Sequence, residues 1–254
     1  MCVPHLHKSP ANPHSRTENS PHLLPYGLET VLFGIDARRP VLTKSQQAYA
    51  DVRRAIIRRA LPAHTALEES FLLQHFPYGR TPLREALKRL AHERLLAWPP
   101  HQAPSIRDIG LYEIQHLYAM RRLLENEIAV LAAKRATVED IDRMDSLQSL
   151  LVQASNAGHV YEAVELDFAL HAAISSATQN RFLAEASNHL NVQSLRMWYY
   201  AQSQLGVAGI HRSHTDLVTA IREHDPEGAL ALSISHIKSS LDRQQAILKP
   251  NDAF

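Results

Sequence analysis

The stretch that decides the fold is Gly79-Arg-Thr-Pro-Leu-Arg-Glu-Ala-Leu-Lys-Arg-Leu90. Pro82 suits the first turn of a helix, because its fixed φ is helical and the N–H that it lacks has no partner in that turn. Gly79 or Thr81 can serve as the N-cap, since both residue types are accepted there. The segment therefore predicts a helix that begins close to residue 80.

Two stripes of side chains run along this expected helix. The apolar stripe, at helical spacing, consists of Leu83, Leu87 and Leu90. The stripe beside it is cationic and consists of Arg80, Arg84 and Lys88. A helix that docks through one side and offers cations on another suits a phosphate-lined DNA groove. A solvated amphipathic helix that is basic by chance fits the same pattern.

The surrounding segment, from Tyr49 to Asp108, resembles the winged helix-turn-helix of the GntR family of bacterial transcription regulators. Arg80–Leu87 matches the family's recognition helix almost letter for letter, and Tyr49–Leu61 and Leu67–Phe76 match two earlier helices. The resemblance implies a homodimer on a palindromic double-stranded DNA operator. It assigns the DNA contacts to Arg80, Thr81, Arg84 and Lys88.

The chain departs from the family pattern at three positions that usually hold glycine. His64 follows the first helix, Arg94 precedes the wing, and the wing tip falls within Pro100-His-Gln-Ala-Pro104. We expect the fold to tolerate these changes, and the minor-groove contacts of the wing to be the feature that they affect.

Charge and cysteine content narrow the class of protein. Residues 43–110 carry 11 Lys/Arg against 6 Asp/Glu, whereas residues 111–254 carry 12 against 17. A basic part before an acidic part suits a nucleic-acid module joined to a part that avoids DNA. Cys2 is the only cysteine, which excludes an intrachain disulfide and a thiolate-rich zinc site. We expect a cytoplasmic protein with no secretory signal and no membrane span. The resemblance to the GntR family further implies a bacterial, nucleoid-associated protein.

Proline content and helical periodicity divide the chain into three parts. Residues 1–42 are rich in proline and are predicted to form a flexible tail. Residues 43–108 are predicted to form the winged helix-turn-helix, with short strands between residues 95 and 107. Residues 109–250 show the helical period throughout and are predicted to form an all-α effector-binding and dimerisation bundle of about six helices. The expected fold class is therefore mainly α.

Four polar side chains fall on apolar helix faces of the bundle. Asp167 and His171 are one turn apart on one face, His214 is in line with Leu217 and Ile221, and His236 follows Leu232 by one turn. Any one of these histidines alone fits a satisfied core residue. Together they indicate a divalent metal site, because a buried carboxylate is costly unless it is paired or binds a metal. Three imidazoles and a carboxylate suit Zn²⁺, Ni²⁺, Mn²⁺ or Fe²⁺.

Residues 110–248 also resemble the metal-containing FCD ligand-binding domain of the FadR-type branch of the same family. The resemblance implies that Asp167, His171, His214 and His236 are the metal ligands, with Zn²⁺ or Ni²⁺ favoured. It also implies open coordination positions for water or an organic carboxylate.

Arg121 belongs to the segment Arg121-Arg-Leu-Leu-Glu125, which matches the first-helix motif of that domain. It shares an apolar stripe with Leu117 and Leu124, and its guanidinium suits a bidentate carboxylate. A structural ion pair with Glu125 explains the same position equally well. The resemblance favours contact with a small organic acid effector.

The sequence therefore predicts a ligand-responsive, homodimeric transcription regulator and not an enzyme. Two alternatives use the same four side chains. One is a metalloenzyme that activates water, and the other is a dedicated metal sensor in which the ion itself is the effector.

Overall fold

The computed structural model describes residues 42–108, 110–207 and 212–247. The predicted N-terminal tail lies outside these ranges, except for Leu42. The described chain is mainly helical, and two small strands are its only sheet, so the predicted fold class is confirmed. None of the described helices is long and apolar enough to cross a membrane.

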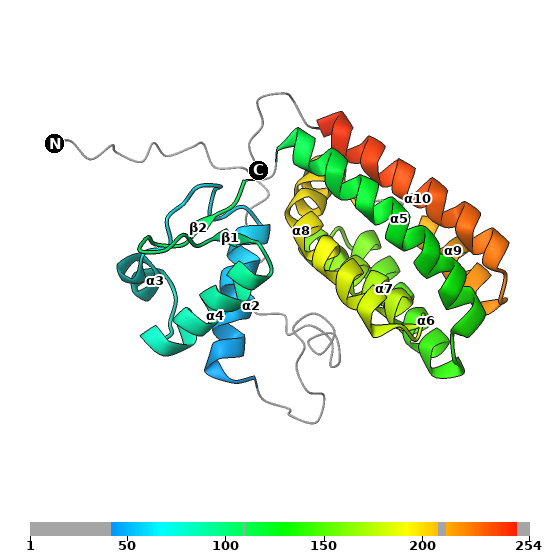
Figure 1. Cartoon of the computed structure of the whole chain (residues 1–254), viewed down its shortest axis with the longest axis horizontal. Coiled ribbons are helices and arrows are strands. Elements are labelled where there is room, and N and C mark those ends of the chain that lie inside the picture. The colour runs from blue at the N-terminus through cyan, green and yellow to red at the C-terminus, as the bar shows by residue number, and fades with distance from the viewer. Residues whose placement is uncertain (1–41, 109, 208–211, 248–254) are drawn as a thin grey trace.

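The N-terminal elements form a small unit of three helices and a two-stranded sheet (Figure 1). They are α2 (Lys44–Ile57), α3 (Glu69–His75), α4 (Arg80–His92), β1 (Leu96–Ala97) and β2 (Ser105–Ile106). The two strands are antiparallel, with Leu96 opposite Ile106. This arrangement is the predicted winged helix-turn-helix.

Helix α2 begins with a capping box, in which the side chains of Thr43 and Gln46 each accept a backbone N–H at the helix start. It ends at Ile57, earlier than the predicted boundary at Leu61. The reason is Arg59, whose φ of 57° is left-handed and cannot continue a right-handed helix.

Helix α4 is the helix predicted from the opening stretch, with Gly79 as its N-cap. Its buried face consists of Leu83, Ala86, Leu87 and Leu90. This face packs mainly against α2, which leaves the cationic stripe in solvent. The spacing of the leucines therefore decides which side of α4 is buried and which side is exposed to solvent.

The backbone keeps its left-handed turns at the positions where glycine was expected. The φ angles are 63° at His64, 59° at Arg94 and 61° at His101 in the wing tip. A left-handed residue with a Cβ costs roughly 1–2 kcal/mol. The turns therefore persist without glycine, because the surrounding fold fixes them.

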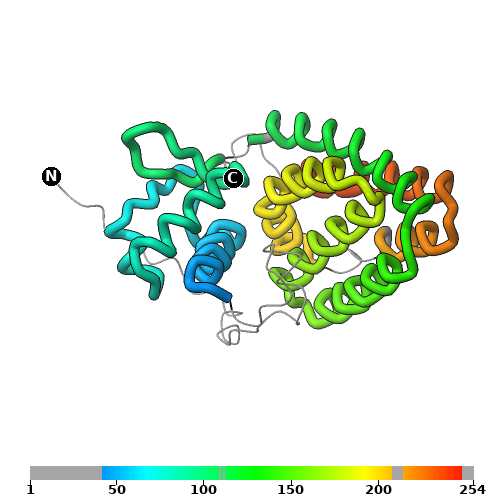
Figure 2. Tube along the Cα trace, turned by 60° about the horizontal axis from the view of Figure 1, so that its bottom comes forward, coloured from blue at the N-terminus to red at the C-terminus, as the bar shows by residue number. Residues whose placement is uncertain are grey.

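The remaining helices form the predicted six-helix bundle (Figures 1 and 2). They are α5 (Leu111–Arg135), α6 (Val138–Asn156), α7 (Val160–Ser176), α8 (Arg181–Leu205), α9 (Arg212–Arg222) and α10 (Pro226–Ile247). A capping box formed by Thr137 and Asp140 starts α6. At the start of α10, which begins with Pro226, the side chain of Asp225 accepts the N–H of Gly228.

Helix α7 lies at the centre of the bundle. It packs between α6 and α8, while α5 packs against α10. Every residue of α7 from Ala163 to His171 is buried. Because α7 is covered on several sides, polar side chains on it face other protein groups rather than water.

Candidate functional site

The exposed side of α4 carries the four side chains predicted to contact DNA. Arg80 and Arg84 have side chains that are 77% and 67% exposed, and Thr81 and Lys88 are also exposed. The predicted cationic surface is thus present and accessible.

Glu69 of α3 is a neighbour of this surface that the sequence analysis did not identify. Its two carboxylate oxygens lie 2.9 Å from Arg80 Nε and 3.6 Å from Arg84 Nη2. Glu69 therefore pairs with two of the guanidinium groups that are predicted to contact DNA. The only sequence signal for it is its place at the start of the preceding helix, where an acidic residue also favours the helix dipole.

The four side chains predicted as metal ligands come from three helices and meet inside the bundle. Helix α7 supplies Asp167 and His171, α9 supplies His214, and α10 supplies His236. All four are buried. One ring nitrogen of each histidine lies within 4.8 Å of one ring nitrogen of each of the others.

The contacts in this cluster are short. The Nε2 atoms of His171 and His214 are 3.2 Å apart. Asp167 joins the cluster at its edge, with Oδ1 3.2 Å from His214 Nε2 and Oδ2 4.0 Å from His171 Nε2. Imidazole nitrogens and a carboxylate that converge in this way are the donor set that divalent transition metals bind.

Burial sets the protonation of the cluster. It lowers the pKa of His171 well below the ordinary value, and the neighbouring His214 and His236 lower it further. Burial likewise lowers the pKa of His236, with help from His214. Both imidazoles are therefore neutral at pH 7, which is the form that binds a metal. Burial raises the pKa of Asp167, while His214 and Arg121 oppose that change.

Glu125 of α5 extends the cluster outward. Its Oε2 lies 3.6 Å from His171 Nδ1, the ring nitrogen opposite the one that faces His214. A carboxylate beside the far nitrogen fixes the orientation of a metal-binding histidine. From the sequence, Glu125 is expected only as a partner of Arg121, because nothing in the spacing links α5 to α7.

Arg121 is 1% exposed and makes the ion pair that the sequence analysis kept as an alternative. Its Nε donates to Glu125 Oε1 at 2.7 Å. Its two terminal nitrogens, Nη1 and Nη2, have no hydrogen-bond partner. The guanidinium carbon lies 4.7 Å from the ring of Tyr118 and 4.6 Å from that of Trp198. The ion pair thus uses one edge of the guanidinium and leaves the outer edge unbonded.

Trp198 connects Arg121 to the histidine cluster. Its ring stacks on His171 with the centroids 5.6 Å apart, and its indole N–H donates to the hydroxyl of Tyr118 at 3.2 Å. Cationic, aromatic and imidazole groups therefore share one buried site. Such a site can hold a metal ion beside a small anion.

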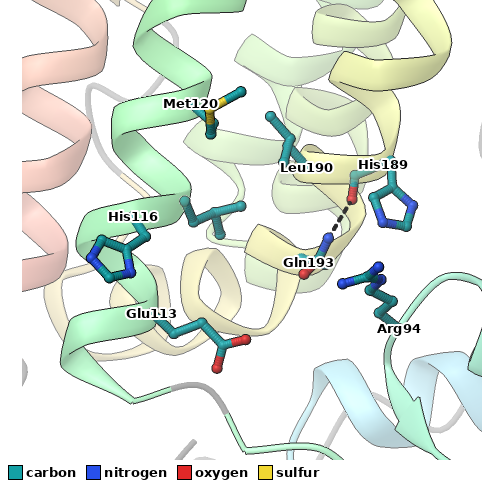
Figure 3. A pocket seen from close by; sticks show the side chains of 8 residues that line it. Arg94, Glu113, His116, Met120, His189, Leu190 and Gln193 are labelled. Atoms are coloured by element: carbon teal, nitrogen blue, oxygen red, sulfur yellow. Dashed lines mark hydrogen bonds between the residues drawn. The ribbon is translucent and has the colours of Figure 1, made fainter.

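A groove opens on another side of the bundle, between α5 and α8 (Figure 3). It has a volume of about 340 Å³. Leu117 and Met120 of α5 and Leu190 of α8 form its apolar part, and Arg94 reaches it from the turn before β1. Beyond the groove, Leu123 of α5 and Phe182 of α8 are exposed.

Comparison with known proteins identifies two family matches. Residues 44–102 match the family "Bacterial regulatory proteins, gntR family", and residues 116–239 match the "FCD domain". The histidine cluster lies in the second match and helix α4 in the first.

Similar curated proteins are transcription regulators. The chain is 23% identical to the HTH-type transcriptional regulator LutR of Bacillus subtilis, over 67% of this chain and 87% of LutR. It is 25% identical to the HTH-type transcriptional regulator McbR of Escherichia coli, over 72% of this chain and 84% of McbR. These relatives support a regulator and leave the metalloenzyme alternative without support.

Solved structures share the fold. E. coli McbR/YncC superposes with a TM-score of 0.69 at 21% identity, covering 81% of this chain and 99% of that chain. A transcriptional regulator GntR from Rhodococcus sp. RHA1 superposes with a TM-score of 0.66 at 16% identity, covering 82% of this chain and all of the other.

Proposed function

Because this chain belongs to the GntR family of bacterial regulatory proteins and carries an FCD domain, we propose that a small organic acid controls its binding to an operator. The chain is a DNA-binding transcription regulator and not an enzyme. In the proposal, residues 43–108 bind DNA, and residues 109–250 bind the effector and dimerise in the bacterial cytoplasm. The observation that carries the proposal is the buried cluster of three histidines together with Nη1 and Nη2 of Arg121, which have no hydrogen-bond partner.

The DNA contacts are assigned to the exposed side of α4. Arg80 and Arg84 reach bases or phosphates, and Thr81 and Lys88 support them. A homodimer presents two such helices, so the operator is a palindrome whose half-sites mirror the protein two-fold axis. Contact with DNA requires Arg80 and Arg84 to leave Glu69, which both of them contact in the free protein.

The effector domain is assigned one divalent ion, with Zn²⁺ or Ni²⁺ favoured and Mn²⁺ or Fe²⁺ also compatible with the donors. His171, His214 and His236 hold it, with Asp167 as the fourth ligand. When bound, the ion supplies positive charge and free coordination positions for oxygen donors. Glu125 orients His171 from the opposite side of the ring.

The effector is a molecule with at least one carboxylate. The free edge of Arg121 offers two parallel N–H donors, a geometry that matches a carboxylate. The guanidinium carbon lies over the rings of Tyr118 and Trp198, and this buried setting strengthens an ion pair. Arg121 thus binds one end of the effector, and the metal site binds the other end.

The homodimer is assigned to the face formed by α5 and α8. Met120, which lines the groove, and Leu123 and Phe182 expose apolar side chains on these two helices. Exposed apolar side chains can mark protein contact surfaces. The groove also receives Arg94, so this face touches the DNA-binding part as well (Figure 3).

The test of the proposal combines DNA selection with an effector screen. Purified protein is used to select duplexes from random DNA, and its melting temperature is measured with a panel of mono- and dicarboxylic acids. A ligand that binds only the folded state raises that temperature. We expect at least one acid both to raise it and to change affinity for the selected DNA.

Arg121→Met links this result to the site, because methionine keeps much of the volume while it removes the guanidinium. We expect metal content and DNA affinity to stay near normal and the response to the acid to fall. Loss of a charge-assisted hydrogen bond costs about 1.5–3 kcal/mol. The matched control is the exposed neighbour, Arg122→Met. An unchanged response in Arg121→Met, or a DNA response to metal alone with no acid, would contradict the proposed effector site.

A further inference from the structure

A fully buried ion pair joins the DNA-binding part to the bundle. Arg53 lies on α2 and Glu165 on α7, and Arg53 Nη1 donates to Glu165 Oε1 at 2.5 Å. The side chains are 1% and 0% exposed. A buried ion pair is often no more stable than apolar side chains of similar volume, because both charges lose their hydration. An ion pair at this position therefore calls for an explanation other than packing.

Two aromatic contacts accompany the ion pair between α2 and α7. Phe168 lies one turn after Glu165, and its ring centroid is 5.6 Å from the guanidinium carbon of Arg53. Tyr161 lies one turn before Glu165, and its ring centroid is 5.8 Å from that of Arg54. Tyr161, Glu165 and Phe168 thus lie at helical spacing on one face of α7 and contact two arginines of α2.

A different face of the same helix carries the proposed metal ligands. Asp167 follows Glu165 by two residues and therefore points about 200° around the helix. His171 is one turn beyond Asp167 on that side. Helix α7 thus touches α2 with one face and the histidine cluster with another. Because residues 163–171 of α7 are all buried, close packing can pass a displacement of one face to the other.

Breaking this ion pair is more costly than loosening one apolar contact, because a buried charge that loses its partner is left without hydration. A shift of α7 must therefore either carry Arg53 and α2 along or separate the pair. The paired and the separated arrangement would be the two states that coupling between distant sites requires.

We propose that Arg53 and Glu165 are the positioning pair that transmits occupancy of the histidine cluster to the DNA-binding part. The proposal rests on the function proposed above, since it assumes that the cluster binds a metal. It assigns the transmission to α7 and α2, rather than to the chain connection around Gly110.

The test measures amide hydrogen exchange in the full-length protein, metal-stripped and loaded with Zn²⁺. In the wild type, loading should slow exchange in α7 and also in α2, by about fivefold or more in α2. The double variant Arg53→Met with Glu165→Met removes both charges and keeps the core filled. It should retain the slowing in α7 and lose it in α2. Glu165→Gln, which keeps the shape and an acceptor for Arg53, should give an intermediate effect and serves if the double variant does not fold.

The matched control is a second contact between the same two parts. The guanidinium carbon of Arg59, just after α2, lies 4.3 Å from the ring of Tyr200 on α8. Arg59→Met should leave the slowing of exchange in α2 unchanged. An equal loss in Arg59→Met and in the double variant would overturn the assignment to the ion pair.

The outcomes separate the two proposals. If Zn²⁺ fails to slow exchange in wild-type α7, the metal site is wrong, and the transmission is wrong with it. If α7 responds but wild-type α2 does not, the transmission alone is overturned. The same holds if α2 responds equally in the wild type and in the double variant.

Discussion

The exposed side of α4 and the centre of the bundle both carry charged groups, but in opposite surroundings. On α4, Arg80 and Arg84 share Glu69 in solvent, where an ion pair contributes about 0–1 kcal/mol. In the bundle, Arg121 and Asp167 are both buried, and Arg121 pairs with Glu125. Removing one partner of a buried ion pair costs about 3–5 kcal/mol. Charges on the surface are thus free to change partner, whereas charges in the core are fixed until a ligand or a helix movement replaces their partner.

This contrast suits the two proposed roles, which are DNA binding on α4 and effector binding in the bundle. Under the proposed function, DNA would compete easily with Glu69 for the arginines, because little is lost when the surface pair breaks. The proposed effector would meet a buried guanidinium whose Nη1 and Nη2 have no hydrogen-bond partner. Substitutions in the two regions should therefore differ in the size of their effects.

The largest effect is expected from the buried histidines. His214→Ala removes a nitrogen that lies close to His171, His236 and Asp167, so the site should lose its ion. Metal present at a thousandfold excess over its Kd stabilises the fold by about 4 kcal/mol, and that stabilisation should disappear. Elemental analysis and thermal melting check both results.

The matched control for His214→Ala is His159→Ala, an exposed histidine at the start of α7 that contacts only Glu162 among the described ion pairs. It should keep metal content and melting temperature near the wild-type values. If wild-type protein contains no divalent metal even after reconstitution, the four side chains are core residues and not metal ligands.

A smaller effect is expected on the exposed side of α4. Arg84→Ala should weaken binding to the selected DNA by about 1–3 kcal/mol, because one bidentate base contact is lost. Helical content and the dimer should stay intact, since Arg84 supports no core contact. Gel-shift titration measures the affinity, with the exposed Arg143→Ala on α6 as control. Unchanged affinity in Arg84→Ala would show that α4 is not the recognition helix.

The pH dependence of the metal-free protein should report the buried imidazoles. Burial lowers the pKa of His171 and His236 in the folded chain, so below the ordinary value of 6.5 the unfolded chain binds protons that the folded chain does not. The free energy of unfolding should therefore fall as the pH drops below that value. The loss is at most about 1.4 kcal/mol per pH unit for each imidazole.

Buried carboxylates act in the opposite direction, because burial raises the pKa of Asp167 and Glu125. The histidine contribution is therefore the difference between wild type and His236→Asn, measured by urea unfolding at about pH 7 and about pH 5.5. The wild type should lose more stability than the variant over this interval. Equal losses would mean that His236 is not held neutral by the fold.

The smallest effect is expected from Glu69→Gln. Removing its charge frees Arg80 and Arg84 and removes a repulsion with phosphate, so DNA affinity should rise. The gain should stay within about 1 kcal/mol, because the surface pairs are weak, and it should shrink as salt is added. Glu68→Gln is the matched control, because Glu68 is the exposed neighbour that immediately precedes α3. Weaker DNA binding in Glu69→Gln would show that Glu69 positions the arginines rather than competing with DNA.

The sequence by itself determined the features that depend on neighbours along the chain. The start of α4 follows from Gly79 and Pro82, its presented side follows from the leucine spacing, and the start of α6 follows from Thr137 and Asp140. That Asp167 and His171 share a face of α7 is equally a matter of helical spacing. These features are local, because a helix fixes which residues share a side and where its unpaired backbone groups are capped.

Only the tertiary structure decided which of these faces meet. Spacing did not reveal that Glu125 lies beside His171, that Glu69 lies beside Arg80, or that Arg53 lies beside Glu165. Each pair joins two helices, and the packing of those helices depends on the shape of the whole core. For Arg121 the sequence left two roles open, an ion pair or an effector contact. The fold shows the ion pair at one edge of its guanidinium and leaves the other edge for the proposed effector, because Glu125 reaches only Nε.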